Sequence, residues 1–535
     1  MEADHVESLI HPHSKRTVGT TNFWLVLCLG IFFASYLVIR YGGLWSENDT
    51  AIFTHDALLT ARYHTTIFPT QYPHGFGYQL WLAILQMTTH MPAGYINTTI
   101  LPFIGVGFTL VLAFVTYKEL MEHVGLSELA ILLILAVPDI MFTVLRGNHE
   151  KLTVILLLAS VFVLVRFLKS SRTKERLLWE LIFYFLIATN GVVNDYFTVM
   201  SIWGMATYLL IGGIFSWRTG FPSGRSLLAV VRLLFISMVL VSIDVWIVYP
   251  PAHADVQLAV QALQRLKALF ATHRIASNPL SSPVQQWVDV PIYLVVSIFR
   301  WIVVFGSFAV WLLTFLRPLR QKEALSVPTL IMISMYAATA ILVAVAVPVD
   351  LTGLAAGSNL EVRNYTYFAL FAVPFVALGI SQLLSMTNRK RYKKGVLVAT
   401  VLLVPFLLIM SLLKSTLDPL ISNQWMFYSA SEKQAVLFYL RHRGAAPGFL
   451  WAGPDERLRN AAATWWPGPI PWYVSGGGTP AFPSFSFWLW SPNIATNSVE
   501  LKDPLPSFHN QNLIYSNGTT KLYAARPASP FEVHP

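Results

Sequence analysis

Acidic residues gather in one stretch near the start of the chain, between residues 46 and 85. Glu47, Asp49 and Asp56 follow a first apolar run, and Asp49 and Asp56 are seven positions apart. In a helix this spacing is two turns, so both carboxylates share one face with Phe53 between them, roughly 10 Å apart. One can act as a general base on an acceptor hydroxyl or amine while the other orients the acceptor or a metal ion. Glu47 is the weaker candidate.

A structural role for Asp49 competes with the catalytic one. Ser46 and Asp49 have the spacing of a capping box, in which side chains accept hydrogen bonds from free N–H groups at a helix N-terminus. On spacing alone this interpretation is favoured. His55 and His64 show no metal-binding spacing and are interpreted as polar loop residues.

Further candidates lie in short polar segments between apolar runs. Arg146 and Glu150 belong to a small turn that either points them toward the first acidic stretch or merely caps two spans. Arg363 suits bidentate phosphate binding, and its alternatives are a snorkelling anchor or a partner of Glu361. Asp139 is a functional-site hypothesis because it falls inside an apolar run.

Three other charged residues are harder to place. Asp195 and Asp244 stand near the ends of spans, the position of ordinary solvated acids. Arg300 falls within an apolar run, so either that run begins as an interfacial segment or Arg300 faces a cavity.

The composition is that of a polytopic membrane protein. Of 535 residues, 55% are hydrophobic and 12% charged, with a mean hydropathy of +0.55, whereas a soluble domain is about 25% charged. The net charge of +10 does not by itself predict a nucleic-acid partner, because the Lys and Arg residues lie mainly in alternate loops between apolar runs. The single cysteine, Cys28, excludes an intrachain disulfide and zinc sites built on several cysteines.

Eleven apolar runs are long enough to cross a bilayer. They cover residues 22–39, 100–117, 129–145, 152–168, 178–193, 196–215, 227–249, 290–316, 327–347, 365–384 and 396–413. Alternate loops are rich in Lys and Arg, which predicts a cytoplasmic N-terminus and an exoplasmic C-terminus. The predicted organisation is a cytoplasmic segment 1–21, a transmembrane domain 22–413 with a first outer loop 41–99, and an exoplasmic domain 414–535.

Two of the predicted outer segments have their own patterns. Residues 255–274 repeat apolar side chains at helical spacing, which predicts a helix either lying in the membrane interface or packed on the bundle. The tail opens with a helical pattern over 431–443 and closes with a hairpin signal around Asn517-Gly518. It is predicted to be a small α+β domain.

The first outer loop leads into the elbow Tyr72-Pro73-His74-Gly75-Phe76-Gly77-Tyr78. With the acidic stretch, the predicted topology, the 146–150 turn and the tail segment IYSNGTTKLY, this elbow resembles the glycosyltransferase C superfamily. Relatives of that superfamily include protein O-mannosyltransferases, the lipid A aminoarabinose transferase and oligosaccharyltransferases. His74 stands where the commoner elbow has its second proline, and the acids are not adjacent, which leaves the base assignment open.

The resemblance implies an inverting transferase that moves a sugar from a polyprenyl-phosphate donor to a lipid, glycan or protein acceptor on the outer membrane face. Asp49, with Asp56 next, would be the base or acceptor binder. Substrate-binding residues are expected among a larger set: Glu47, Tyr72, His74, Arg146, Glu150 and Arg363.

Such chemistry needs a base near the acceptor and a cation near the leaving phosphate, but no nucleotide. No P-loop or other nucleotide motif is present in the sequence. No cofactor is certain, and a divalent cation, Mg or Mn, is a possible partner. Two alternatives stay open: a transporter or lipid flippase, and a non-catalytic membrane scaffold whose outer domain binds a partner.

Overall fold

The computed structural model describes residues 21–44, 48–66, 74–272, 290–351, 360–386, 390–418, 420–421, 428–442, 449–454, 457–465, 474–475, 485–500, 505, 508 and 511–525. Glu47 and Tyr72, two predicted site residues, lie outside these ranges.

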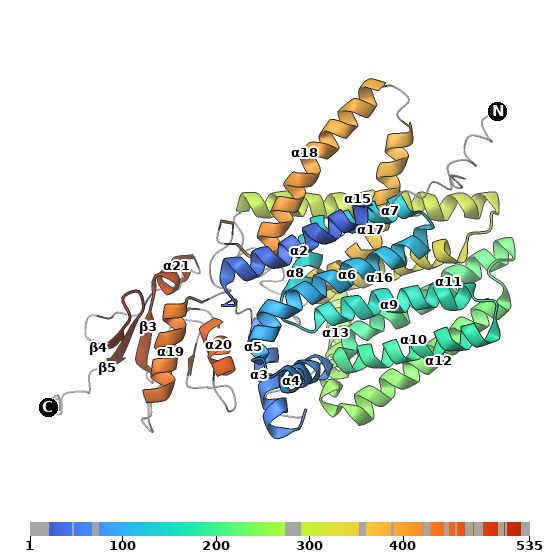
Figure 1. Cartoon of the computed structure of the whole chain (residues 1–535). Helices are drawn as coiled ribbons and strands as arrows, with labels where there is room; N and C mark the ends of the chain where they lie inside the picture. The colour runs from blue at the N-terminus through green and yellow to red at the C-terminus, as the bar shows by residue number, and fades with distance from the viewer. Residues whose placement is uncertain are drawn as a thin grey trace.

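Helices form most of the described chain, and the long apolar ones run side by side as a bundle (Figure 1). The first half contains α2 (Thr21–Tyr41), α3 (Asn48–Tyr63), α4 (Gly77–Thr89), α5 (Ala93–Tyr95), η1 (Ile96–Ile100), α6 (Leu101–Met121), α7 (Val124–Ala136), α8 (Pro138–Leu145), α9 (Glu150–Lys169), α10 (Thr173–Val193), α11 (Asp195–Thr219) and α12 (Gly224–Ile243). The second half contains η2 (Asp244–Val248), η3 (Pro250–Ala252), α13 (His253–Thr272), α15 (Val290–Gln321), α16 (Val327–Leu351), α17 (Leu360–Met386) and α18 (Lys390–Ser415).

The predicted membrane spans all coincide with helices. In the described chain, nine helical segments are long and apolar enough to cross a membrane, α7 and α8 form a bent pair, and α18 has a shorter apolar part, Leu402–Ser415. The protein is therefore a multi-pass, mainly helical membrane protein, as predicted. Its main apolar core lies between α2, α6, α7, α9, α11, α16 and α17.

The third predicted span is not one straight helix. It breaks at Val137, where α7 and α8 meet at 76°. Pro138 explains the break, because a residue before proline avoids the helical region and proline is well placed as the first residue of a new helix. Asp139 therefore lies in the first turn of α8, where the helix dipole favours an acid, and its carboxylate is 3.7 Å from Lys414 Nζ.

The C-terminal part forms a small α+β unit beside one end of the bundle (Figure 1). It contains α19 (Ala430–His442), β1 (Phe449–Trp451), α20 (Arg457–Trp465), β2 (Val474–Ser475), β3 (Phe485–Trp490), α21 (Pro492–Glu500), β4 (Gln511–Ser516) and β5 (Lys521–Ala525). The sheet order is β2-β1-β3-β5-β4, parallel among the first three strands and antiparallel beyond.

The tail predictions are confirmed in detail. The helical pattern at 431–443 becomes α19, and β4 and β5 form the hairpin around Asn517-Gly518, where Gly518 has a φ of +93°. Inside the unit, buried Arg457 and Glu432 pair at 3.0 Å, and Ser491 donates a hydrogen bond to the same carboxylate. Burial opposes ionisation of Glu432, but Arg457 holds the pKa of that carboxyl below its usual value.

Two contacts join the chain's early and late elements. Tyr36 and Arg40 of α2 both reach the carboxylate of Asp418, at 2.6 and 3.0 Å. Helix α20 packs on α3, and His55 Nδ1 lies 2.7 Å from the carbonyl oxygen of Ala463. The prediction of His55 as a polar loop residue is wrong, because His55 is buried in α3.

Candidate active site

The two predicted polar stretches meet at one end of the bundle. Asp49 stands in the first turn of α3, and its carboxylate lies 3.2 Å from the guanidinium of Arg146 in the turn between α8 and α9. The same guanidinium lies 2.9 Å from Glu150. All three side chains are largely buried, so this cluster is called the Asp49 cluster below.

A buried asparagine holds the Asp49 cluster together. Asn97 donates hydrogen bonds to the hydroxyl oxygen of Thr54 and the carbonyl oxygens of Thr50 and Gly147, at 3.0 to 3.3 Å. Its own side-chain oxygen accepts one from Tyr78 at 2.6 Å. Helix α3, the 146–149 turn and α4 are thereby fixed to one another.

Gly147 is required by this close approach. A Cβ at that position would lie 2.6 Å from the side-chain oxygen of Asn97 and 2.7 Å from a methyl group of Thr50. The amide of Gly147 also donates to the Thr50 hydroxyl at 3.0 Å. No sequence pattern predicts the role of Asn97. Asn97-Thr98-Thr99 matches only the acceptor pattern for N-glycosylation, and a fully buried side chain cannot carry a glycan.

The electrostatics of the cluster keep Asp49 ionised. Burial opposes ionisation, yet the positive charges of Arg146 and Arg363 lower the pKa of Asp49 below its usual value. His149, between Arg146 and Glu150 in the chain, is buried against Phe53 with ring centroids 5.0 Å apart. Burial lowers the pKa of His149 to about 3, so its imidazole is neutral at pH 7.

Arg363 belongs to the same region. It stands in the first turns of α17, and its charge lowers the pKa of Asp49. Glu361, the partner that the sequence offered for Arg363, pairs with Arg300 of α15 at 2.6 Å. Arg300 also lies 3.9 Å above the Tyr365 ring, which explains a charge within an apolar run: it faces α17, near the start of its span.

Asp56 lies two turns along α3 from Asp49, as predicted, and is almost fully buried. Its surroundings differ from those of Asp49. Burial, together with the negative charges of Asp56 and Asp195, raises the pKa of Tyr249. The two predicted acids therefore have different roles available to them.

The elbow residue His74 belongs to a second group. Its Nδ1 lies 2.5 Å from Asp255 of α13, and Asp195 joins both, with one donor atom from each residue within 4.8 Å of the others. The expectation that Asp195 and Asp244 are solvated is wrong: they are only 5% and 7% exposed. In the described part of the chain no other set of three His, Cys, Asp or Glu residues is arranged to hold a metal ion.

Gly75 explains how the elbow reaches this position. It has a φ of +147°, and a Cβ there would lie 2.5 Å from the carbonyl oxygen of Val193. The close approach allows the Phe76 amide to donate to Val192, and the Asp195 amide to His74, at 3.0 and 3.1 Å. The glycine of the elbow motif is thus needed for docking on the α10–α11 junction.

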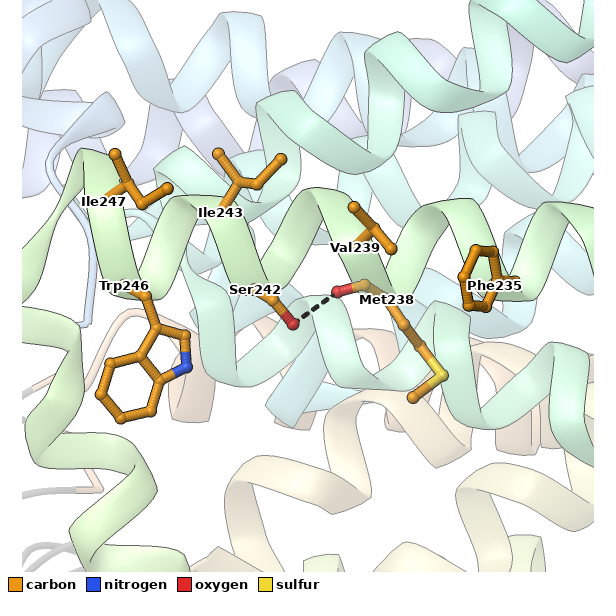
Figure 2. A pocket seen from close by; sticks show the side chains of 7 residues that line it. All are labelled: Phe235, Met238, Val239, Ser242, Ile243, Trp246 and Ile247. Atoms are coloured by element: carbon orange, nitrogen blue, oxygen red, sulfur yellow. Dashed lines mark hydrogen bonds between the residues drawn. The ribbon is translucent and has the colours of Figure 1, made fainter.

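A shallow groove on α12 has a different character. It is lined by Phe235, Met238, Trp246 and neighbouring apolar side chains, with no charged residue. Figure 2 shows its single hydroxyl, on Ser242, donating to the carbonyl oxygen of Met238, and the other polar group of the lining side chains is the indole N–H of Trp246. Its chemistry is that of a surface facing lipid tails.

No protein-family model matches this chain, and no curated protein sequence matches it. Solved structures do resemble it. The oligosaccharyltransferase of Archaeoglobus fulgidus, tethered with an acceptor peptide containing the NVT sequon, matches with a TM-score of 0.52 at 13% identity, over 86% of this chain and 61% of that one. The same protein in complex with zinc and sulfate gives 0.48 at 11% identity, over 86% and 59%. ArnT from Cupriavidus metallidurans, bound to undecaprenyl phosphate, gives 0.49 at 10% identity, over 95% and 100%.

The match to the peptide-tethered archaeal enzyme decides the architecture. The chain has the fold of that oligosaccharyltransferase. The resemblance predicted from the elbow and the acidic stretch is thereby confirmed at the level of the fold. This chain spans about three fifths of the archaeal enzyme's length.

The Asp49 cluster lies at the ends of helices that could span a membrane. Arg146 precedes the start of α9, and Arg363 stands near the start of α17. His149, buried beside this cluster, is a residue that the sequence did not single out.

Proposed function

We propose that this protein is an inverting membrane glycosyltransferase that takes its sugar from a polyprenyl-phosphate donor. The observation that carries the proposal is the Asp49 cluster: ionised Asp49 beside Arg146, with the charge of Arg363 close enough to lower the pKa of Asp49. A carboxylate next to guanidinium groups at the membrane edge fits a reaction between a polar acceptor and a lipid phosphate. The glycosyltransferase C fold is consistent with this chemistry.

The proposed reaction is a displacement at the anomeric carbon. An acceptor oxygen or nitrogen forms a bond to that carbon while the bond from carbon to the phosphate oxygen breaks, and polyprenyl phosphate leaves with the electron pair. The acceptor's proton passes to a carboxylate. Asp49 is the first candidate for the base or for the group that binds the acceptor, and its lowered pKa favours the second of these roles. Asp56, which is buried two turns along α3, is the second candidate for the base.

The leaving phosphate needs a positive partner. We assign the phosphate to Arg363, because its charge acts on Asp49 and its guanidinium can bind two phosphate oxygens. A divalent cation, Mg or Mn, would be the alternative source of positive charge, although the described residues around Asp49 include no set of three metal ligands. Glu47, Tyr72 and His74 stay predicted substrate contacts.

The proposal also includes the orientation in the membrane. Loop charges place the N-terminus in the cytoplasm, and the Asp49 cluster, α13 and the C-terminal α+β unit outside. The acceptor is a lipid, a glycan or a protein on the outer face.

The test is transfer of labelled sugar from a panel of polyprenyl-phosphate sugars, using the purified full chain in lipid nanodiscs and membrane-extract acceptors. Asp49→Asn and Arg363→Ala are expected to lower transfer at least a hundredfold, since each removes a charged group at the reacting centre. Glu119→Gln is the matched control: Glu119 pairs with Arg166 and Lys169 near the other end of α9, and transfer should be unchanged. Undiminished transfer in folded Asp49→Asn would overturn the assignment of Asp49.

A further inference from the structure

Three side chains with metal-binding atoms meet beside the elbow, from segments far apart in the sequence. His74 comes from the elbow, Asp195 from the start of α11 and Asp255 from the first turn of α13. One donor atom from each lies within 4.8 Å of the other two. The side chain of Asp255 is 10% exposed, and Asp195 is more deeply buried.

The group brings two largely buried carboxylates together. Two carboxylates buried side by side cannot both ionise unless a cation lies between them. With both ionised, Asp255 Oδ2 is closed off from solvent and has no hydrogen-bond donor among the described residues.

We propose that His74, Asp195 and Asp255 bind one divalent transition-metal ion, such as zinc or manganese. One imidazole and two carboxylates form a ligand set that these metals accept, with a fourth position left for water. Donor atoms around one zinc ion lie roughly 3.2–3.6 Å apart, so side-chain shifts of about 1 Å close the site. Magnesium and calcium prefer all-oxygen ligands and fit the histidine poorly.

Two of the three ligands are held in place by the main chain. The hydrogen bonds from Asp195 to His74 and from Phe76 to Val192 fix the elbow against the α10–α11 junction. The third ligand belongs to α13, whose residues Val256 and Leu263 are 39% and 69% exposed. The ion therefore acts as a strut that holds α13 against the elbow, next to the Asp49 cluster.

The proposal does not depend on the transferase function, and its test measures metal rather than transfer. Purified full-length protein in nanodiscs is stripped with EDTA, titrated with Zn²⁺ by calorimetry, and analysed for metal after desalting. The wild type is expected to take up one ion that His74→Ala and Asp255→Asn each bind at least tenfold more weakly. Asp49→Asn is the matched control and should keep that ion.

A second measurement distinguishes the loss of the metal site from misfolding of a variant. Trypsin cleavage at exposed Arg265 or Lys267 of α13 should slow in the wild type when Zn²⁺ is added and not in Asp255→Asn. Three results would overturn the proposal: no uptake of Zn²⁺, Mn²⁺ or Co²⁺ by the wild type, unchanged uptake by His74→Ala, or loss of the ion in Asp49→Asn alone. The last result would assign the metal to the Asp49 cluster instead.

Discussion

The side chain of Asn97 donates a hydrogen bond to the carbonyl oxygen of Gly147 across 3.2 Å, joining segments 50 residues apart. This bond, with the three others that Asn97 makes, sets the position of the turn that carries Arg146. The distance from Asp49 to Arg146 therefore depends on a residue that contacts neither charge.

Replacing Asn97 with alanine tests this dependence. The change removes the hydrogen bonds that Asn97 makes with the Thr50 and Gly147 carbonyls and with the Tyr78 hydroxyl, each of which contributes about 0.5–1.5 kcal/mol. We expect a lower unfolding temperature and, below it, transfer reduced about a hundredfold through misplacement of the turn. Thr98→Ala is the control, because its hydroxyl bonds only to its own helix at Gly94. Equal transfer by both variants would contradict the positioning role.

The elbow glycine offers a test of backbone packing. Gly75→Ala forces a Cβ to within 2.5 Å of the Val193 carbonyl and strains a φ of +147°. We expect the variant to lose stability on the order of 1–3 kcal/mol from strain alone. The measurement is the thermal unfolding temperature of the protein in nanodiscs. Gly107→Ala in α6 has open space around its Cβ and should unfold at the wild-type temperature or slightly above. A wild-type melting curve for Gly75→Ala would show that the elbow does not dock in this way.

His149 should make the protein sensitive to acid. Its folded pKa, about 3, lies below its unfolded value of about 6.5, so the unfolded chain takes up a proton first as the pH falls. Stability is therefore complete above about pH 6.5 and decreases toward pH 3, by up to about 2 kcal/mol between pH 6.5 and 5. The groups that act on this imidazole are Glu150, Asp49, His74 and Arg146.

His149→Gln removes this titration. Its unfolding temperature should change less between pH 7 and pH 5 than that of the wild type. Parallel pH profiles for the two proteins would mean that folding does not lower the pKa of His149.

The contact between α3 and α20 predicts a link between the bundle and the C-terminal unit. His55→Ala removes the interaction with the Ala463 carbonyl and leaves that oxygen without its partner, while Arg457 and Glu432 keep the unit folded. We expect faster proteolysis in the chain before α19 with little change in the unit itself. The measurement is limited proteolysis with mass analysis of the fragments. Thr464→Ala, whose hydroxyl bonds within α20, is the control.

Sequence patterns were sufficient for the spans, the tail hairpin and α19, because these depend on local periodicity and turn chemistry. That Asp49 and Arg146 lie close together could also be expected from the sequence, because loops predicted on one side of a membrane face the same compartment. The roles of Asn97 and of the group around Asp195 could not be predicted from the sequence. Their roles depend on burial between helices that are distant in the chain, and a single polar residue in an apolar run gives no sign of which neighbour it will meet.

The contact of Asp418 with Tyr36 and Arg40 connects residues separated by 382 and 378 positions. A chain made from its N-terminus inserts α2 first, yet α2 obtains these partners only after residue 418 has been synthesised. Until then the guanidinium of Arg40 must be accommodated by lipid headgroups or by the insertion machinery. The order of biosynthesis thus leaves the first helix as one of the last elements to reach its final contacts.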